Sequence, residues 1–247
     1  MLPILNMRTI RLLIIIALSV LCIGLSPEKP KLIKTKVVNK VQIPTWYHEG
    51  LYFDGKDIWV SNGLKGKIWV VDTEKGKVKR EIYPVGAFTE AITSAEKDVY
   101  IVSDWDSKKI YSARIDNDVM RAEKELTVEP AHPAGAAWNG KNLFLITWTR
   151  SLSGTKFRLL TMDGKFNILK SHDITEIQEP SQLAWDGKNL WVSSWYDNRV
   201  FKIDPDTLDV VGYFKSPVKK TTGIAWDGKH FWVTGTYSDL YKVELQN

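Results

Sequence analysis

A short pattern recurs five times along the chain, in which a polar turn is followed by an apolar strand. The five blocks read FDGKDIWV from Phe53, SAEKDVYI from Ser94, WNGKNLFL from Trp138, WDGKNLWV from Trp185 and WDGKHFWV from Trp226. They follow one another at intervals of about 41 to 47 residues, which is the period of four-stranded propeller blades. The repeat therefore predicts an all-β fold, a five-bladed β-propeller.

Each repeat carries the strands of one blade. The Asp-Gly and Asn-Gly pairs supply the positive φ of a tight hairpin turn, and the residues after them alternate with the period of a strand. A second hairpin follows, formed by residues 67–72 with 77–82 in the first repeat and by 199–204 with 210–214 in the fourth. Because one such sheet cannot bury both faces alone, the five are expected to pack in a ring.

The two ends of the repeat region complement each other. The last repeat has room for three strands, ending at residues 240–245, while residues 36–43 form a strand-like segment ahead of the first blade. Pairing them closes the ring and removes an open sheet edge. The propeller domain is thus expected to span 36–247 without a linker. Trp59, Trp191 and Trp232 share one repeat position, which favours packing between blades over stacking on a ligand.

Residues 1–26 are predicted to be a signal peptide or a short N-terminal anchor. Arg8 and Arg11 precede an apolar run of about 14 residues, a length typical of a signal and short for a spanning helix. The protein is therefore expected to be exported, and to be periplasmic, extracellular or anchored to the outer face of the cytoplasmic membrane. Cys22, the only cysteine, lies in this segment, so no disulfide is expected in the propeller. Residues 27–35 are expected to form a solvated tether near an anionic membrane surface.

Charge and motifs exclude several classes of function. The formal net charge is +5, but lysines alternate with acidic residues and form no basic stripe, which argues against nucleic-acid binding. The sequence has no GxSxG, phosphate-binding glycine loop, CxxC or HExxH, and its four histidines are scattered. We therefore expect a monomer without a metal or cofactor, whose partner is a peptide or small molecule at the channel mouth.

The innermost strands begin with a variable residue, about five positions ahead of each polar turn. In chain order these residues are Glu49, Glu90, Ala134, Ser181 and Thr222. They ring one mouth of the channel, where propellers usually bind ligands. Both acids follow an aromatic residue by two positions, after Tyr47 and Phe88. An aromatic neighbour can desolvate a carboxyl group and raise its pKa toward an acid–base role, although two hydrated glutamates on the rim explain the pattern equally well.

At these residues the chain resembles the plant and bacterial type of glutaminyl-peptide cyclotransferase. The resemblance covers most of residues 36–246 and is carried by YHEGL, AFTEAI, SNGLKGKIWVVDTEKGKV and VTGTYSDLYKV. It implies a five-bladed propeller closed by an N-terminal strand, and conversion of N-terminal glutamine to pyroglutamate without a metal. Glu90 matches the family's essential glutamate, and Glu49 matches a glutamine or glutamate of the first blade. Tyr47 and Phe88 match two phenylalanines.

The resemblance also implies the rest of the site. Trp195 matches a fourth-blade tryptophan, while Trp105 is displaced by one residue from the second-blade one. Three positions depart from the family, because Ala134 replaces a tryptophan, Ser181 an asparagine and Thr236 a lysine. On this basis Glu90 is the catalytic residue. The substrate-binding residues are Glu49, Tyr47, Phe88, Trp105, Trp148, Ser181, Trp195 and Thr236.

Two other functions remain open. The three departures favour a non-catalytic propeller that binds a peptide, sugar or protein partner at its mouth. A metal-dependent lactonase of the gluconolactonase type also carries Glu-Gly in its first blade, but it needs six blades and asparagine ligands that are not found in this sequence. The sequence thus predicts an exported, metal-independent cyclotransferase-like propeller, with a binding propeller as the alternative.

Overall fold

The computed structural model describes residues 29–43 and 46–246, and in these residues every regular element is a β-strand. The first blade contains β3 (His48–Phe53), β4 (Ile58–Asn62), β5 (Lys67–Val71) and β6 (Val78–Ile82). The second contains β7 (Thr89–Glu96), β8 (Val99–Asp104), β9 (Lys109–Asp116) and β10 (Val119–Thr127). The third contains β11 (His132–Trp138), β12 (Leu143–Ser151), β13 (Gly154–Met162) and β14 (Ile168–Ile174).

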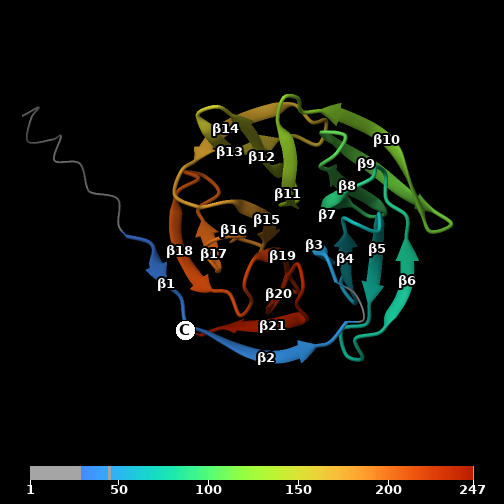
Figure 1. Cartoon of the computed structure of the whole chain (residues 1–247), viewed down its shortest axis with the longest axis horizontal. Helices are drawn as coiled ribbons and strands as arrows, with labels where there is room; N and C mark the ends of the chain where they lie inside the picture. Colours follow the sequence, from blue (N-terminus) through green and yellow to red (C-terminus); the bar gives the residue numbers. More distant parts are fainter. Residues whose placement is uncertain (1–28, 44–45, 247) are drawn as a thin grey trace, which may run out of the picture.

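The fourth blade contains β15 (Pro180–Trp185), β16 (Leu190–Ser194), β17 (Arg199–Ile203) and β18 (Val210–Lys215). The fifth contains β19 (Thr221–Trp226), β20 (Phe231–Gly235), β21 (Leu240–Leu245) and, from the other end of the chain, β2 (Thr35–Val41). The innermost strands β3, β7, β11, β15 and β19 surround the centre of the ring (Figure 1). The predicted five-bladed propeller is confirmed, and five blades do not fit the six-bladed lactonase alternative.

The N-terminal strand closes the ring as predicted. β2 runs antiparallel to β21, from Thr35 opposite Leu245 to Val41 opposite Leu240. Just before it, β1 (Lys31–Leu32) pairs in parallel with β18 and extends the sheet of the fourth blade. Two residues of the expected tether are therefore attached to a blade. The predicted signal or anchor lies outside the described residues, and none of the described residues forms a helix capable of crossing a membrane.

The polar turn of the first, fourth and fifth repeats is held by one carboxylate in each. Asp186 accepts hydrogen bonds from the backbone N–H groups of Lys188 and Asn189 through Oδ1, and from the indole of Trp191 through Oδ2 at 2.7 Å. Asp54 with Trp59, and Asp227 with Trp232, repeat this arrangement. The three tryptophans are almost completely buried in the apolar layers between blades. Their predicted packing role is confirmed.

Candidate functional site at the channel mouth

The mouth positions share a backbone irregularity. In all five blades the pairing of the inner strand with its neighbour shifts register at this point, between residues 48 and 51, 89 and 91, 133 and 136, 180 and 183, and 221 and 223. Bulges of this kind bend a strand and re-aim side chains. Glycines follow the mouth residue in three blades, and a Cβ on Gly50 would lie only 2.6 Å from the backbone oxygen of Glu90. The inner strands can therefore approach closely enough to bring their mouth residues together.

One cavity unites most of the predicted site. This mouth cavity has a volume of about 240 Å³ and is lined from blades one to four. Its lining contains Glu49, Glu90, Trp105, Trp148, Ser181 and Trp195 from the predicted set, together with Ala134. The polar side chains that it adds are Arg150, Thr155 and Glu179. The cavity thus gathers both acids and three tryptophans around a space suited to a small ligand.

Both acids are half-buried in the cavity wall and hold their protons unusually tightly. Burial, and secondarily the charge of Glu90, raises the pKa of Glu49 to about 9. Burial raises the pKa of Glu90 to about 7, and the negative charges of Asp104 and Asp106 contribute to that rise. Near neutral pH, Glu49 is therefore protonated and Glu90 can either release or accept a proton. The desolvated alternative is favoured over two hydrated rim glutamates.

The aromatic wall includes a residue that the sequence analysis missed. His132 stacks on both Trp105 and Trp148, with ring centroids 4.9 Å and 4.6 Å away, and the two indole centroids are themselves 6.1 Å apart. Its Nδ1 lies 3.0 Å from the backbone oxygen of Trp105. Phe88 extends the wall, at 5.8 Å from Trp105. The Phe88 ring also covers Gly63, where a Cβ would meet it at 2.3 Å. The four rings thus form one aromatic cluster, in which Trp105 and Trp148 line the cavity and His132 and Phe88 pack behind them.

A second ring of equivalent positions lies two residues before the mouth residues. Its members are Tyr47, Phe88, His132, Glu179 and Lys220. Tyr47, Glu179 and Lys220 have left-handed φ values of 67°, 47° and 53°. The Nζ of Lys220 lies 4.3 Å from the ring centroid of Trp195. The signal that could have identified these residues was present in the repeat, because the two-residue offset noticed for Tyr47 and Phe88 applies to all five blades.

The other predicted residues are placed differently. Burial, and after it the charges of nearby groups that include Glu49 and Glu90, raises the pKa of Tyr47. The backbone N–H of Tyr47 donates a hydrogen bond to the backbone oxygen of Thr236 at 2.6 Å. Thr236 itself is buried beside a separate rim cavity with Lys220 and Tyr237. The hydroxyl of Ser181 donates to the backbone oxygen of Thr222 at 3.2 Å. Ser181 and Thr236 therefore contribute less to the mouth cavity than the acids do.

Gln182 lies one residue beyond the mouth residue Ser181 on the inner strand of the fourth blade. It occupies the position where the neighbouring inner strands have glycine or alanine, and its side chain is almost completely buried. Its Nε2 reaches from the fourth blade to the backbone oxygen of Leu51 in the first blade, at 3.4 Å. The side-chain oxygen has no hydrogen-bond partner among the described residues. Gln182 thus spans two blades that are not neighbours and narrows the channel below the acids.

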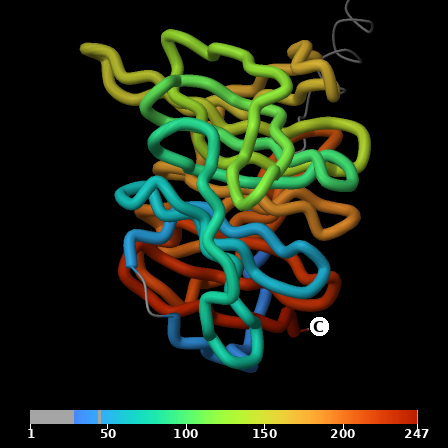
Figure 2. Tube along the Cα trace, turned by 90° about the vertical axis from the view of Figure 1, so that its right-hand side faces the viewer, coloured from blue at the N-terminus to red at the C-terminus, as the bar shows by residue number. Residues whose placement is uncertain are grey.

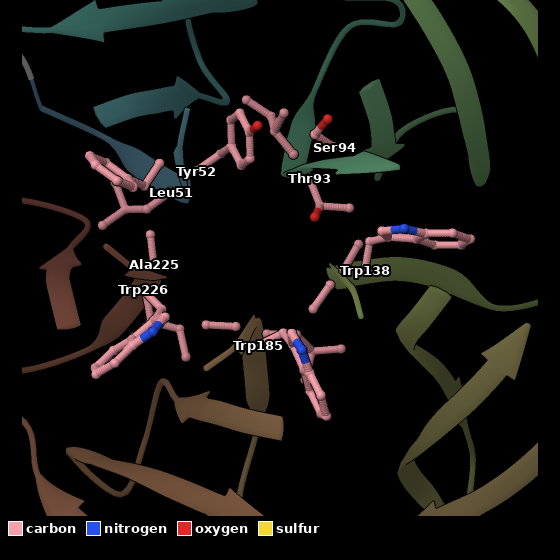
Figure 3. Close-up of a pocket in the computed structure, with 15 residues that line it drawn as sticks. Leu51, Tyr52, Thr93, Ser94, Trp138, Trp185, Ala225 and Trp226 are labelled. Carbon is pink, nitrogen blue, oxygen red and sulfur yellow. The ribbon is translucent and has the colours of Figure 1, made fainter. Parts of the chain in front are cut away.

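The opposite end of the channel has a different lining. This base cavity has a volume of about 190 Å³ and is ringed by Tyr52, Thr93, Trp138, Trp185 and Trp226, among others. In Figure 3 the three indole rings point away from the opening. Trp185 stacks on Phe144 of the neighbouring blade, with centroids 6.2 Å apart. The base cavity therefore has large side chains directed into the blades rather than toward a ligand.

The described residues provide no ready metal site. No group of three histidine, cysteine, aspartate or glutamate side chains among residues 29–43 and 46–246 is arranged to hold a metal ion. The acids of the mouth cavity face aromatic rings and each other. The mouth cavity therefore places two carboxyl groups with raised pKa values in an aromatic-walled space, where they can exchange protons with a ligand.

Comparison with known proteins identifies a family and a fold. A family model described as glutamine cyclotransferase matches residues 12–245. Glutaminyl cyclase from Myxococcus xanthus is similar in structure, with a TM-score of 0.70 and 16% identity over 89% of this chain and 100% of that chain. An aldose sugar dehydrogenase from Streptomyces coelicolor gives a TM-score of 0.55 and 12% identity over 86% and 98%. Virginiamycin B lyase from Staphylococcus aureus gives 0.52 and 14% over 87% and 100%. These structural likenesses show the propeller fold alone, and no curated protein matches the sequence.

Proposed function

The chain belongs to the glutamine cyclotransferase family, and we propose that it cyclises the N-terminal glutamine of peptides to pyroglutamate with release of ammonia. The observation that carries the proposal is the pair Glu49 and Glu90, which face one aromatic-walled cavity from adjacent inner strands. An intramolecular cyclisation needs no second substrate and no water. It needs a group that moves a proton and a wall that holds the glutamine in a folded conformation.

Glu90 is suited to move the proton. Its carboxylate accepts a proton from the α-amine nitrogen while that nitrogen bonds to the γ-carboxamide carbon. The carboxyl then returns a proton to the amide nitrogen, the original C–N bond breaks and ammonia leaves. A pKa of about 7 places Glu90 between its two protonation states under working conditions.

Glu49 is suited to a different task. Because its pKa of about 9 keeps it protonated at neutral pH, its O–H can donate a hydrogen bond to the carboxamide oxygen. That oxygen gains negative charge when the ring closes, so a donor fixed beside it stabilises the transition state. Trp105, His132 and Trp148 exclude water from the same side.

The test is ammonia release from Gln-Ala amide by the full-length protein, with and without EDTA. We expect release above the protein-free rate in both conditions, and none from N-acetylated Gln-Ala amide, whose blocked amine cannot attack. Loss of activity in EDTA would contradict a metal-independent reaction. Absence of release from any Gln-led peptide would overturn the proposal.

A binding propeller is the second candidate, favoured by Ala134 and Ser181. Ala134 brings no functional group to the mouth, and the Ser181 hydroxyl is already engaged with a backbone oxygen. Such a protein would bind Gln-led peptides at the same cavity without releasing ammonia. Isothermal titration combined with the ammonia assay separates the two functions.

Export and membrane attachment are part of the proposal and rest on residues 1–26 of the sequence. Arg8, Arg11 and the apolar run after them support a location outside the cytoplasmic membrane. Cell fractionation tests this, since recovery of the native protein in the cytosol would contradict it.

A further inference from the structure

A large groove lies beside the mouth cavity, between the second and third blades. This hairpin groove has a volume of about 810 Å³. One wall is the segment 126–131, which comprises the end of β10 and the connection to β11, and the other is the hairpin of β12 and β13. Trp148 and Arg150 line both the hairpin groove and the mouth cavity. Trp148 and Arg150 pair with Phe157 and Thr155, which line the mouth cavity, whereas the alternate residues Lys156 and Arg158 line the groove. The two spaces therefore lie on opposite faces of the hairpin and adjoin along the edge of β12.

The hairpin projects beyond its blade. β12 and β13 have nine residues each, and β12 pairs with β11 only as far as Trp148 opposite His132. The last three residues, Thr149 to Ser151, extend past that pairing and face no other described strand on that edge. Figure 2 shows the hairpin in yellow, extending beyond the neighbouring loops. An edge of this kind can pair with an extended peptide.

The hairpin groove is basic on the hairpin side. Lys156 and Arg158 point to the groove face of β13, whereas Arg150, opposite Thr155, lies on the mouth face of the hairpin. Arg158 pairs with Asp173 at 2.8 Å, whereas Arg150 and Lys156 have no ion-pair partner among the described residues. On the opposite wall, Glu129 lies 3.6 Å from Lys108. Leu126, Val128 and Leu160 add apolar surface between these charges.

We propose that the hairpin groove binds the part of a peptide substrate that follows its N-terminal residue, as an extended strand against β12, and that it favours acidic side chains. This proposal rests on the proposed function of the mouth cavity. An N-terminal residue held at Glu49 and Glu90 directs the following residues past Trp148 and along the free edge of β12, which borders the groove. The uncompensated charge of Lys156, with Arg158 next to it on the same face of β13, then favours carboxylates.

The experiment measures peptide binding separately from turnover. A Glu90→Gln protein is titrated with two fluorescent Gln-led octapeptides that differ only in carrying three glutamates or three lysines after the second residue. We expect the acidic peptide to bind about tenfold more tightly. The Lys156→Glu/Arg158→Glu double variant should weaken acidic-peptide binding by about tenfold, because it turns two attractive contacts into repulsive ones.

The matched control is Lys141→Glu/Lys165→Glu, which makes the same charge change in turns at the other end of the third blade. Its affinity for the acidic peptide should stay within about twofold of the parent. If the double reversal does not fold, Lys156→Gln replaces it. Equal affinity for the acidic and basic peptides would overturn the proposal that the groove binds acidic peptides. So would a control variant that weakens acidic-peptide binding as much as the Lys156/Arg158 double variant does. Failure of Gln-Ala amide to cyclise would instead overturn the proposed function, since that ligand is too short to reach the groove.

Discussion

The two ends of the channel are built from the same five repeats, but they differ in how much the residues at equivalent repeat positions vary. At the base, the aspartates at 54, 186 and 227 make the same bonds to backbone and indole. At the mouth, equivalent positions hold chemically different residues, from Glu49 and Glu90 to Ala134 and Thr222. Repetition thus occurs where each blade must form the same turn. Divergence occurs where one asymmetric cavity is needed, so a substitution at the mouth should alter chemistry and one at the base should alter stability.

The largest effect is expected from Glu90→Gln. The variant keeps the shape of the side chain but cannot carry a proton, so kcat on Gln-Ala amide should fall by about 100-fold or more with KM nearly unchanged. Steady-state ammonia release measures both constants. Glu49→Gln is the comparison variant and should act mainly on KM, because glutamine can still donate a hydrogen bond. A kcat for Glu90→Gln within tenfold of the parent would remove Glu90 from the mechanism.

Asp186→Ala should show the opposite behaviour at the base. It removes two backbone hydrogen bonds, the bond from the Asn189 side chain and the bond to the buried indole of Trp191, at a cost of about 2–3 kcal/mol in the free energy of unfolding. For a chain of this size the melting temperature should fall by roughly 5–10 °C. Asn139→Ala serves as the control, since that turn has the backbone bonds but Phe144 in place of an indole. Equal losses in both variants would show that the indole bond contributes nothing.

The two ends should also respond to pH with opposite sign. Burial alone would raise the pKa of Asp186, but its hydrogen bonds from Asn189 and Trp191 lower it overall, so the stability it contributes is present above pH 4 and is lost in acid. The pKa values of Glu49 and Glu90 are raised, so their contribution is fully present below about pH 4.5 and is lost as pH rises through about 7 and 9.

Thermal melts across pH test this difference. When the pH is raised from 5 to 9, the melting temperature of Glu49→Gln should fall less than that of the parent. The difference between the two decreases should be roughly 3–6 °C. Asp186→Asn should flatten only the acid side of the profile. If both variants parallel the parent at high pH, the mouth acids are hydrated and their pKa values are ordinary.

The smallest effect is expected from Ser181→Ala. Because the hydroxyl donates to the backbone oxygen of Thr222, its loss removes a strand contact and no group aimed at a ligand. The kcat/KM for Gln-Ala amide should change by less than about threefold. A tenfold loss would show that Ser181 turns toward the substrate when one is bound.

The fold was predictable because the base of each repeat follows local rules. An aspartate, a glycine with positive φ such as Gly187 at 95°, and an alternating strand specify a hairpin without distant contacts. The acids of the site were predictable for a related reason, since two glutamates interrupted the pattern expected of inner strands. His132 and Lys220 were missed because each is chemically unlike its equivalents, so that only the two-residue offset from the mouth residue, and no shared residue type, marks their positions.

Other parts of the site depend on backbone geometry. The bulge that turns Glu49 and Glu90 into the cavity depends on strand register, and the position of Gln182 depends on how close two opposite blades come. The pairing of β1 with the fourth blade likewise has no signal in two residues of sequence. These features arise from the closed ring and cannot be read from a single repeat.

The closing pair of strands also has a consequence for how the chain reaches its native state. β2 emerges before the strands of the first four blades that follow it in sequence, and its partner β21 follows roughly 200 residues later. The contact that completes the ring therefore has nearly the greatest sequence separation among the described strands. Until then β2 is a strand without a partner, and Lys36 and Lys40 on it oppose its association with other chains. Ring closure is therefore expected to be the slow step of folding, and an intact C-terminus a condition for completing it.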